Sequence, residues 1–166
     1  TNGGLWRYLI GDTIRFTSTF PHRFVIVGRT KLFINVFGEE LMIENADFAI
    51  EKACLKTHSV MADYTAGPVY MKDGKGGGHE WIIAFEKHPE NLQEFTAILD
   101  EQLQLVNSDY AAKRKENMGM NPPLVHAASA DTFYKWLKEK GKLGGQNKVP
   151  RLCNDREILE AILPKL

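Results

Sequence analysis

Apolar and polar residues alternate along the beginning of the chain, which predicts short β-strands in this region. The predicted strands are residues 5–10, 13–18, 23–27 and 32–36. The first two form a strand pair, or one long strand that bends at Gly11 and Asp12. Glycine and aspartate are poor strand formers, so strand propensity does not account for this interruption.

From residue 38 onward, segments in which apolar residues recur with the period of a helix alternate with segments that have the pattern of a strand. Apolar residues recur at steps of three and four at Ala46, Ala49, Ile50 and Ala53, which predicts a helix with Asn45 as its N-cap. Further helices are predicted at residues 90–106, 131–140 and 155–163, a helical turn at 110–116, and strands at 60–72, 79–86 and 124–128. This order predicts an α+β fold, in which helices flank a small mixed β-sheet and a short all-β segment precedes it.

The overall charge excludes some classes of partner. The 166 residues include 21 Lys and Arg and 21 Asp and Glu, so the formal net charge is zero, which argues against a general polyanion binder. No apolar stretch has the length of a membrane span, and no secretory signal is visible. The two cysteines, Cys54 and Cys153, make no disulfide framework. We therefore expect a cytoplasmic protein that has no membrane or nucleic-acid partner.

Several motifs that suggest chemistry have simpler interpretations. The glycine-rich stretch DGKGGG is followed by the strand pattern HEWIIAFE, whereas a phosphate-binding loop leads into a helix; it therefore predicts a hairpin. The five histidines show no metal-ligand spacing, and no nucleophile and base pair can be recognised from one sequence. The adjacent acids Glu39 and Glu40 precede a helix, a position where solvated carboxylates are favoured.

Asp12, Arg29 and Lys148 remain as candidates. Each follows or lies near glycine, in GD, in GR and just beyond the Gly-Gly pair of GGQNK. Considered singly, Asp12 has the simpler interpretation of a strand bulge, and Arg29 and Lys148 that of surface cations.

Taken together, three stretches resemble the C-terminal part of an adenylate-forming enzyme. They are LWRYLIGDTIRF, FVIVGRTKLFINVFGEEL and PPLVHAASADTFYKWLKEKGKLGGQNKVPRL. The chain is similar over nearly its whole length to the auxin-responsive acyl-acid amido synthetase (Gretchen Hagen) family in its bacterial form. The closing block is specific to that family, whereas the GD and GR signals belong to the wider adenylate-forming superfamily.

The resemblance implies roles for particular residues. Asp12, which ends a strand that contains Tyr8, would accept hydrogen bonds from both ribose hydroxyls of ATP, because a carboxylate offers two acceptor oxygens. Arg29 would reach the ribose or a phosphate, and Lys31 would lie at a hinge. Lys148 would meet the α-phosphate and the carboxylate oxygens during adenylation, where an ammonium stabilises the developing negative charge.

The resemblance also implies a division of the chain. Residues 1–28 would be terminal β-strands of a large N-terminal adenylation domain that is otherwise absent, residues 29–38 the hinge, and residues 39–166 a mobile C-terminal α+β domain. The implied enzyme is an ATP-dependent ligase that converts a small carboxylic acid to an acyl-adenylate and then joins it to an amine or amino acid. Because the N-terminal domain would bind most of ATP and Mg²⁺, we expect these residues alone to be inactive.

Two other classes of function fit the same pattern. A stand-alone α+β ligand-binding or regulatory module without catalysis would leave Asp12 and Lys148 incidental. A reader of single-stranded RNA would need exposed aromatic residues on the sheet and a basic rim. The predicted strands do carry aromatic residues, but their alternation and the neutral charge favour a core position. These aromatic residues are Tyr64, Tyr70, Trp81 and Phe85.

Overall fold

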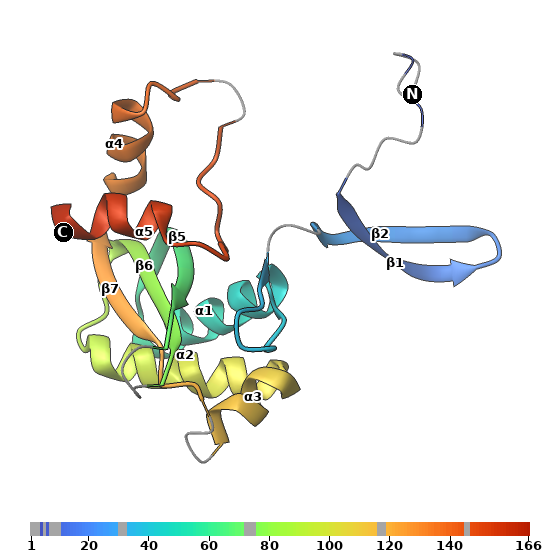
Figure 1. Cartoon of the computed structure of the whole chain (residues 1–166), viewed down its shortest axis with the longest axis horizontal. Helices are drawn as coiled ribbons and strands as arrows, with labels where there is room; N and C mark the ends of the chain where they lie inside the picture. The colour runs from blue at the N-terminus through green and yellow to red at the C-terminus, as the bar shows by residue number, and fades with distance from the viewer. Residues whose placement is uncertain are drawn as a thin grey trace.

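A β-hairpin extends away from the other elements of the molecule (Figure 1). Its strands are β1 (Asp12–Thr19) and β2 (His22–Arg29), which pair antiparallel with β-bulges or irregularities in register. The computed structural model describes residues 4, 6, 11–29, 33–71, 76–115, 119–144 and 147–166, without the side chains of residues 12, 13 and 27–29. The predicted strand at residues 5–10 lies almost entirely outside this range, whereas those at 13–18 and 23–27 are confirmed.

A mixed three-stranded sheet forms the centre of the remaining structure. Its strands are β5 (Val60–Val69), β6 (Gly78–Lys87) and β7 (Leu124–Ser129), in the order β5-β6-β7. The β5 and β6 strands are antiparallel, which confirms the hairpin predicted around the glycine-rich stretch, and β7 runs parallel to β6. The short strands β3 (Phe33–Ile34) and β4 (Leu41–Met42) form a separate small ladder.

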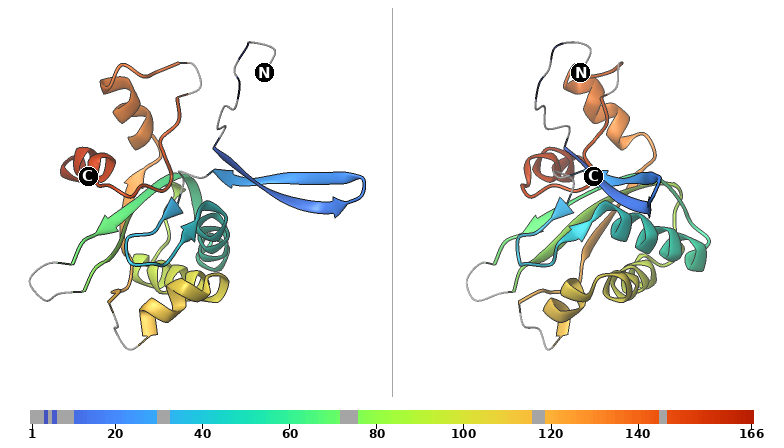
Figure 2. Two further views of the ribbon diagram at one scale, coloured as in Figure 1. Left: turned by 45° about the vertical axis from the view of Figure 1, so that its right-hand side comes forward. Right: turned by 90° about the vertical axis from the view of Figure 1, so that its right-hand side faces the viewer.

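Helices cover both faces of this sheet (Figure 2). They are α1 (Ile43–Thr57), α2 (Leu92–Val106), α3 (Ser108–Arg114), α4 (Thr132–Glu139) and α5 (Glu157–Ile162), followed by the 3-10 turn η2 (Leu163–Lys165). The predicted α+β class and mixed sheet are confirmed. None of the described helices is long and apolar enough to cross a bilayer.

Strand β6 is apolar on both faces and therefore contributes to two cores. Trp81, Ile83 and Phe85 face the helices α1 and α2, whereas Ile82 and Ala84 pack with α4 and α5. This alternation follows from the two-residue period of a strand. Both groups are at most 2% exposed, so β6 is the centre of the fold.

The aromatic residues of the sheet are core residues, apart from one. Tyr64 and Trp81 have no exposed surface, and their rings stack at a centroid distance of 5.8 Å. Phe85 is 2% exposed, whereas Tyr70 is 50% exposed. The stacking surface that a single-stranded RNA reader needs is therefore not formed by these side chains.

Helix α1 begins earlier than the sequence pattern predicts. Its N-cap is Met42, because β4 leads directly into the helix, and the prediction of Asn45 as the N-cap was wrong. Asn45 instead occupies the first turn, where its Oδ1 accepts a hydrogen bond from the Met42 backbone N–H at 3.1 Å. Helix α2 has a conventional cap, since the Asn91 side chain accepts from the backbone N–H of Gln93 and Glu94.

Candidate functional site

Asp12 and Arg29 are direct cross-strand partners in the β1–β2 hairpin. The two residues predicted to bind nucleotide therefore share the end of the hairpin opposite its turn, although 17 positions separate them in sequence (29 − 12). Tyr8 and Lys31, predicted as a nucleotide-binding and a hinge residue, lie outside the described residues, and so do the side chains of Asp12 and Arg29.

Lys148 lies on an extended segment, residues 147–153, between α4 and α5. Its side chain is exposed and makes no hydrogen bond or ion pair with any described residue. The next residue, Val149, is 5% exposed and packs in the core between the sheet, α4 and α5. The Lys148 ammonium is therefore available to solvent while the adjoining backbone is fixed. Figure 1 shows this segment and the hairpin as separate parts of the molecule.

Backbone hydrogen bonds attach the Lys148 segment to β5. The Ala66 N–H donates to the Arg151 carbonyl at 2.8 Å, and the Cys153 N–H donates back to the Ala66 carbonyl at 2.9 Å. The Thr65 hydroxyl donates to the Pro150 carbonyl at 2.8 Å. Residues 150–153 thus make a single parallel bridge, between Leu152 and Ala66, at the β5 edge of the sheet. The sequence pattern, which predicts only an extended stretch at 148–151, does not reveal this partner.

The Arg151 side chain adds a second attachment. Its Nη1 lies 3.0 Å from each carboxylate oxygen of Asp47 on α1, and its Nε lies 3.5 Å from Oδ1 of Asp63 on β5. The guanidinium carbon stands 5.2 Å from the centroid of the Tyr64 ring. Sequence reasoning missed this cluster; its one signal is Arg151 itself, inside the closing block NKVPRL.

Tyr64 orients the carboxylate that Arg151 binds. Its hydroxyl donates a hydrogen bond to Asp47 Oδ1 at 2.7 Å. Burial raises the pKa of Tyr64 far above its ordinary value, and the hydrogen bond to Asp47 raises it further. The phenol therefore stays protonated and acts as a donor across the physiological pH range.

Cys153, at the end of the same segment, is an unreactive thiol at neutral pH. Burial, followed by the negative charge of Asp155, raises its pKa to about 11. Because the thiolate is the nucleophilic form, Cys153 is poorly suited to covalent catalysis. The chemistry available on this segment is therefore that of the Lys148 ammonium.

Glu39 is the first residue after the predicted hinge, residues 29–38, and it is buried. The local sequence predicts a solvent-exposed Glu39, but its side chain has no exposed surface and its Oε1 lies 2.8 Å from His79 Nε2. Its two carboxylate oxygens accept from the backbone N–H of Val36 and Phe37 at 3.2 and 2.7 Å. Burial alone would raise the pKa of Glu39, but the hydrogen bond from His79 and those from backbone N–H groups lower it. The prediction of a solvated acid holds only for Glu40, which is exposed.

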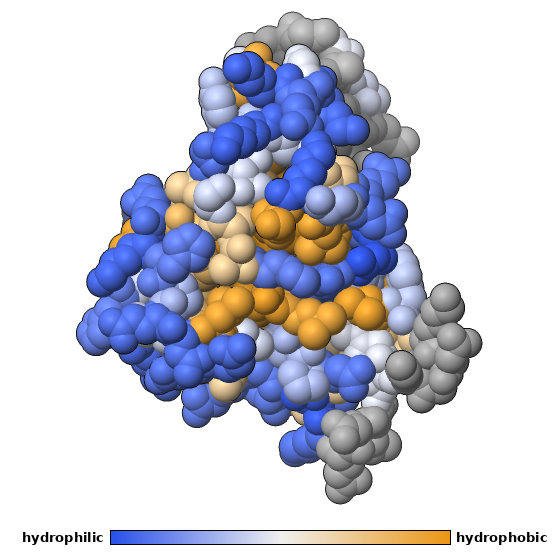
Figure 3. Space-filling view, turned by 90° about the vertical axis from the view of Figure 1, so that its left-hand side faces the viewer, coloured by the Kyte–Doolittle hydropathy of each residue, from blue (hydrophilic) through white to orange (hydrophobic). Residues whose placement is uncertain are grey.

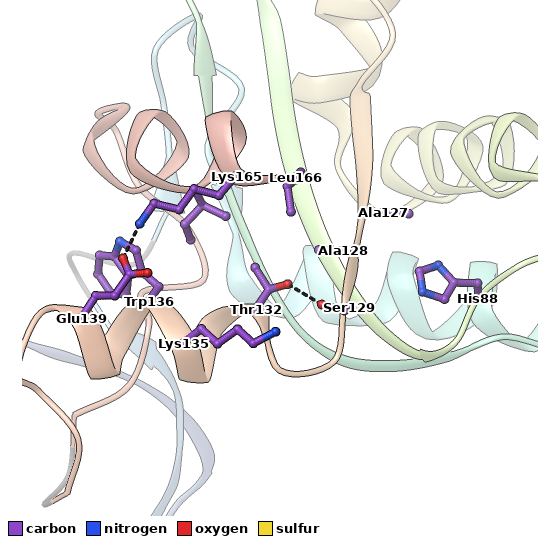
Figure 4. A pocket seen from close by; sticks show the side chains of 11 residues that line it. His88, Ala127, Ala128, Ser129, Thr132, Lys135, Trp136, Glu139, Lys165 and Leu166 are labelled. Carbon is purple, nitrogen blue, oxygen red and sulfur yellow. Dashed lines mark hydrogen bonds and ion pairs between the residues drawn. The ribbon is translucent and has the colours of Figure 1, made fainter.

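A cavity of about 470 Å³ lies between β7, α4 and η2 (Figure 4). Its polar lining includes Lys135, which pairs with Asp131 at 2.7 Å, and Lys165, which pairs with Glu139. Both ammonium groups are thus already neutralised by carboxylates of the chain. The cavity therefore provides less positive charge to stabilise a bound anion than the unpaired Lys148 does.

A second hollow of about 490 Å³ lies on the face of the molecule that carries β7. Its lining comes from α2 and from residues 122–125, and is mostly apolar. Figure 3 shows apolar side chains gathered on this face. Within the described part of the chain, no group of three His, Cys, Asp or Glu side chains is placed to hold a metal ion.

A match to a known protein family identifies the class of protein to which this fold belongs. The sequence pattern of the GH3 family C-terminal domain matches residues 44–157, from α1 to the start of α5. The chain therefore belongs to the GH3 family, and the matched residues are its C-terminal domain. The resemblance to the amido synthetase family is confirmed at this level.

One curated relative matches the chain along most of its length. Indole-3-acetic acid-amido synthetase GH3.15 of Arabidopsis thaliana is 25% identical over 181 aligned residues, which cover 98% of this chain and 29% of that protein. This chain therefore spans less than a third of its relative.

Two solved structures share the fold. The GH3.15 acyl acid amido synthetase has a TM-score of 0.77 and 21% identity, covering 99% of this chain and 31% of that one. The AtGH3.15 acyl acid amido synthetase in complex with 2,4-DB has a TM-score of 0.72 and 20% identity, covering 97% of this chain and 30% of that one. The hairpin and the α+β body thus occur together in a larger protein of this fold.

Proposed function

We propose that this chain is the C-terminal portion of an ATP-dependent acyl-acid amido synthetase, a ligase of the adenylate-forming superfamily. Membership of the GH3 family and the similarity to two amido synthetase structures support the class of enzyme. The observation that carries a catalytic role for this portion is Lys148, an unpaired, exposed ammonium on a backbone that the core and β5 hold in place.

The proposed reaction has two steps. A small carboxylic acid attacks the α-phosphate of ATP, so that a carboxylate–phosphorus bond forms and pyrophosphate leaves. An amine, typically that of an amino acid, then attacks the acyl carbon and AMP leaves. Lys148 acts in the first step, where its positive charge stabilises the negative charge that develops on the α-phosphate oxygens.

The hairpin supplies the nucleotide contacts of this chain. Asp12 accepts hydrogen bonds from the two ribose hydroxyls, and Arg29, its cross-strand partner, reaches the ribose or a phosphate. Tyr8 is the third residue that we assign to nucleotide binding. Mg²⁺ would be bound, with most of ATP, by the N-terminal domain, where it would neutralise phosphate charge. No step assigned to this chain depends on the metal ion.

The exposed side chains of the hairpin support a division into parts. Phe16, Phe20, Phe24 and Ile26 are 53–91% exposed, and an isolated two-stranded hairpin is marginally stable in water. Residues 1–28 therefore belong to the body of an N-terminal adenylation domain that covers them. Residues 29–38, with Lys31, are the hinge, and residues 39–166 are the mobile domain.

The buried contact between Glu39 and His79 supports the end of the proposed hinge at residue 38. Glu39 is fixed to β6 through His79, so the backbone from this residue onward moves with the sheet. Rotation about residues 29–38 presents different faces of the small domain to one cleft in the two steps. The bacterial form of the family and a cytoplasmic location are also part of this proposal.

The test is carboxylate-dependent exchange of pyrophosphate into ATP, measured on the polypeptide as its gene encodes it, across a panel of small carboxylic acids. We expect exchange with at least one acid, and its loss in Lys148→Ala and in Asp12→Ala. Lys142→Ala is the matched control, because Lys142 is also exposed and lies in the same loop region. Full exchange in the Asp12 or Lys148 variant would contradict the role assigned to that residue.

The alternative, a ligand-binding or regulatory module without catalysis, gives a different result in the same assay. It predicts no exchange with any acid, whatever the variant. Release of AMP on addition of an amino acid mixture would then be absent as well.

A further inference from the structure

We propose that Arg151 is a positioning residue for Lys148, an inference that rests on the proposed synthetase function. The two residues share the short extended stretch NKVPR. Arg151 would not touch ATP or the acid. It would act by holding the backbone from which the Lys148 side chain projects.

Positioning is needed because the chain before Lys148 gives it little support. Gly141 and Gly144 have φ angles of +65° and +93°, and no atom lies within 4 Å of a Cβ placed on either residue. The described residues of this loop, 141–144, are all exposed. Asn147, directly before Lys148, donates hydrogen bonds to the Lys142 and Gly144 carbonyls at 3.3 Å, but both lie in this same exposed loop. The contacts that join the Lys148 backbone to the core therefore come from the residues that follow it.

Those residues are attached at three levels. The Val149 side chain is buried, and residues 150–153 hydrogen-bond to β5. The Arg151 guanidinium then connects the segment to a second element, since it contacts Asp47 on α1 as well as Asp63 on β5. Because Nη1 and Nε of one rigid, planar guanidinium contact carboxylates on two different elements, these contacts restrain rotation of the segment as well as its distance from the sheet.

The cluster is suited to positioning more than to stability. The side chains of Arg151, Asp47 and Asp63 are 37%, 42% and 38% exposed, so solvent screens their charges and their contribution to global stability is small. Removing Arg151 would leave two carboxylates facing each other without a cation between them. We therefore expect the segment to shift while the domain stays folded.

The experiment compares the unaltered polypeptide, as its gene encodes it, with Arg151→Ala and Arg151→Lys in the pyrophosphate-exchange assay. Arg151→Ala should lower kcat about 10- to 100-fold and change KM for ATP less than about threefold, because a misplaced group costs transition-state stabilisation more than substrate binding. Arg151→Lys should recover part of kcat, since it restores the charge without the planar fork. Asp47→Asn, which alters the partner, should also lower kcat.

A double variant separates positioning from general damage. If Arg151 acts through Lys148, the residual exchange rate of Lys148→Ala/Arg151→Ala, measured at high enzyme concentration, should equal that of Lys148→Ala. Lys135→Ala is the matched control: it also removes an ion pair at the surface of the body, with side chains 65% and 52% exposed. It should leave kcat unchanged.

The outcomes are distinguishable from a failure of the proposed function. If the unaltered protein exchanges no acid, or Lys148→Ala is fully active, the synthetase role of Lys148 is wrong and the positioning role is overturned with it. If Lys148→Ala is inactive but Arg151→Ala keeps full kcat, only the positioning role is overturned. Multiplying losses in the double variant, or an equal loss in Lys135→Ala, would also overturn it.

Discussion

The Nε2 atom of His79 lies 2.8 Å from Oε1 of Glu39, and neither side chain reaches solvent. The pair joins the loop after β3 to the beginning of β6, two parts of the chain that are 40 residues apart. The aromatic rings of Phe37, Trp81 and Tyr110 surround the imidazole at centroid distances of 5.7–6.5 Å. Such a pair is costly to break, because the remaining partner stays buried and uncompensated.

We expect Glu39→Gln to lower the free energy of unfolding of this chain by about 3 kcal/mol. Glutamine keeps the size of glutamate but loses the charge that faces His79 and the second acceptor oxygen that receives a backbone N–H. Urea titration followed by tryptophan fluorescence measures the change. Glu90→Gln, at an exposed residue without a described contact, is the control and should have no measurable effect.

The stability that Glu39 provides should depend on pH with a definite sign. Its pKa in the folded chain lies below its ordinary value, so its contribution is fully present above the unfolded-state pKa of about 4.3 and is lost as pH falls through the folded-state pKa. The difference in unfolding free energy between the unaltered chain and Glu39→Gln should therefore be constant from about pH 7 to pH 5 and shrink below about pH 4. Denaturation at several pH values tests this. A difference that grows on acidification would contradict the assignment.

Gly67→Ala should disturb the attachment of the C-terminal segment to β5. A Cβ at this position would lie 2.7 Å from the Asp155 backbone oxygen and 3.0 Å from Leu159 Cδ1, distances that require backbone movement. We expect a loss of about 1–3 kcal/mol in unfolding free energy and faster hydrogen exchange at the Cys153 amide. Gly76→Ala, where the nearest atoms belong to a surface asparagine side chain at 3.2–3.4 Å, should cost clearly less.

Cys153 should react slowly with thiol reagents at neutral pH. Because its pKa is raised to about 11, the thiolate fraction, and with it the rate, should rise about tenfold per pH unit between about pH 7 and pH 9. The rate is measured with an aromatic disulfide reagent in a Cys54→Ala background, which leaves Cys153 as the one thiol of the sequence. A rate that levels off near pH 8 would show a more acidic thiol than the structure implies.

The chain alone should bind ATP or AMP weakly. Asp12 and Arg29 lie on a hairpin whose apolar side chains are exposed, so this part of the proposed nucleotide site lacks a second wall. Isothermal titration of the 166 residues should show no saturation below about 100 μM, an affinity weaker than about 5.5 kcal/mol. Sub-micromolar binding would mean that the site is complete within this chain.

Local sequence patterns predicted the elements well where one physical effect dominates. Burial alone accounts for the apolar run of β6 and for the helical spacing of four residues in α1, and all of these residues are in the core. The four α1 residues are Ala46, Ala49, Ile50 and Ala53. The start of α1 was predicted less well. Asn45 is a favoured capping residue, but a tertiary constraint, the β3–β4 ladder, brings the chain into the helix earlier.

Contacts between distant residues could not be predicted from these patterns. Arg151 and Asp47 are 104 positions apart, and the local sequence around either residue does not predict that the two are in contact. The same holds for Glu39, whose local sequence favours a solvated acid until His79 is brought beside it by the fold. Family resemblance selected Lys148, but the partners that hold its backbone were visible only in three dimensions.

The attachment of the Lys148 segment to α1 has a consequence for timing in the proposed enzyme. Arg151 connects the segment to α1, the first helix after residues 29–38. If the small domain rotates as proposed, Lys148 would therefore move together with the whole domain. A single swing would thus bring the activating cation to the phosphate and later withdraw it, clearing the acyl carbon for the incoming amine. The order of the two half-reactions would then follow from one rigid-body rotation, with no further conformational change needed to remove Lys148 from the site.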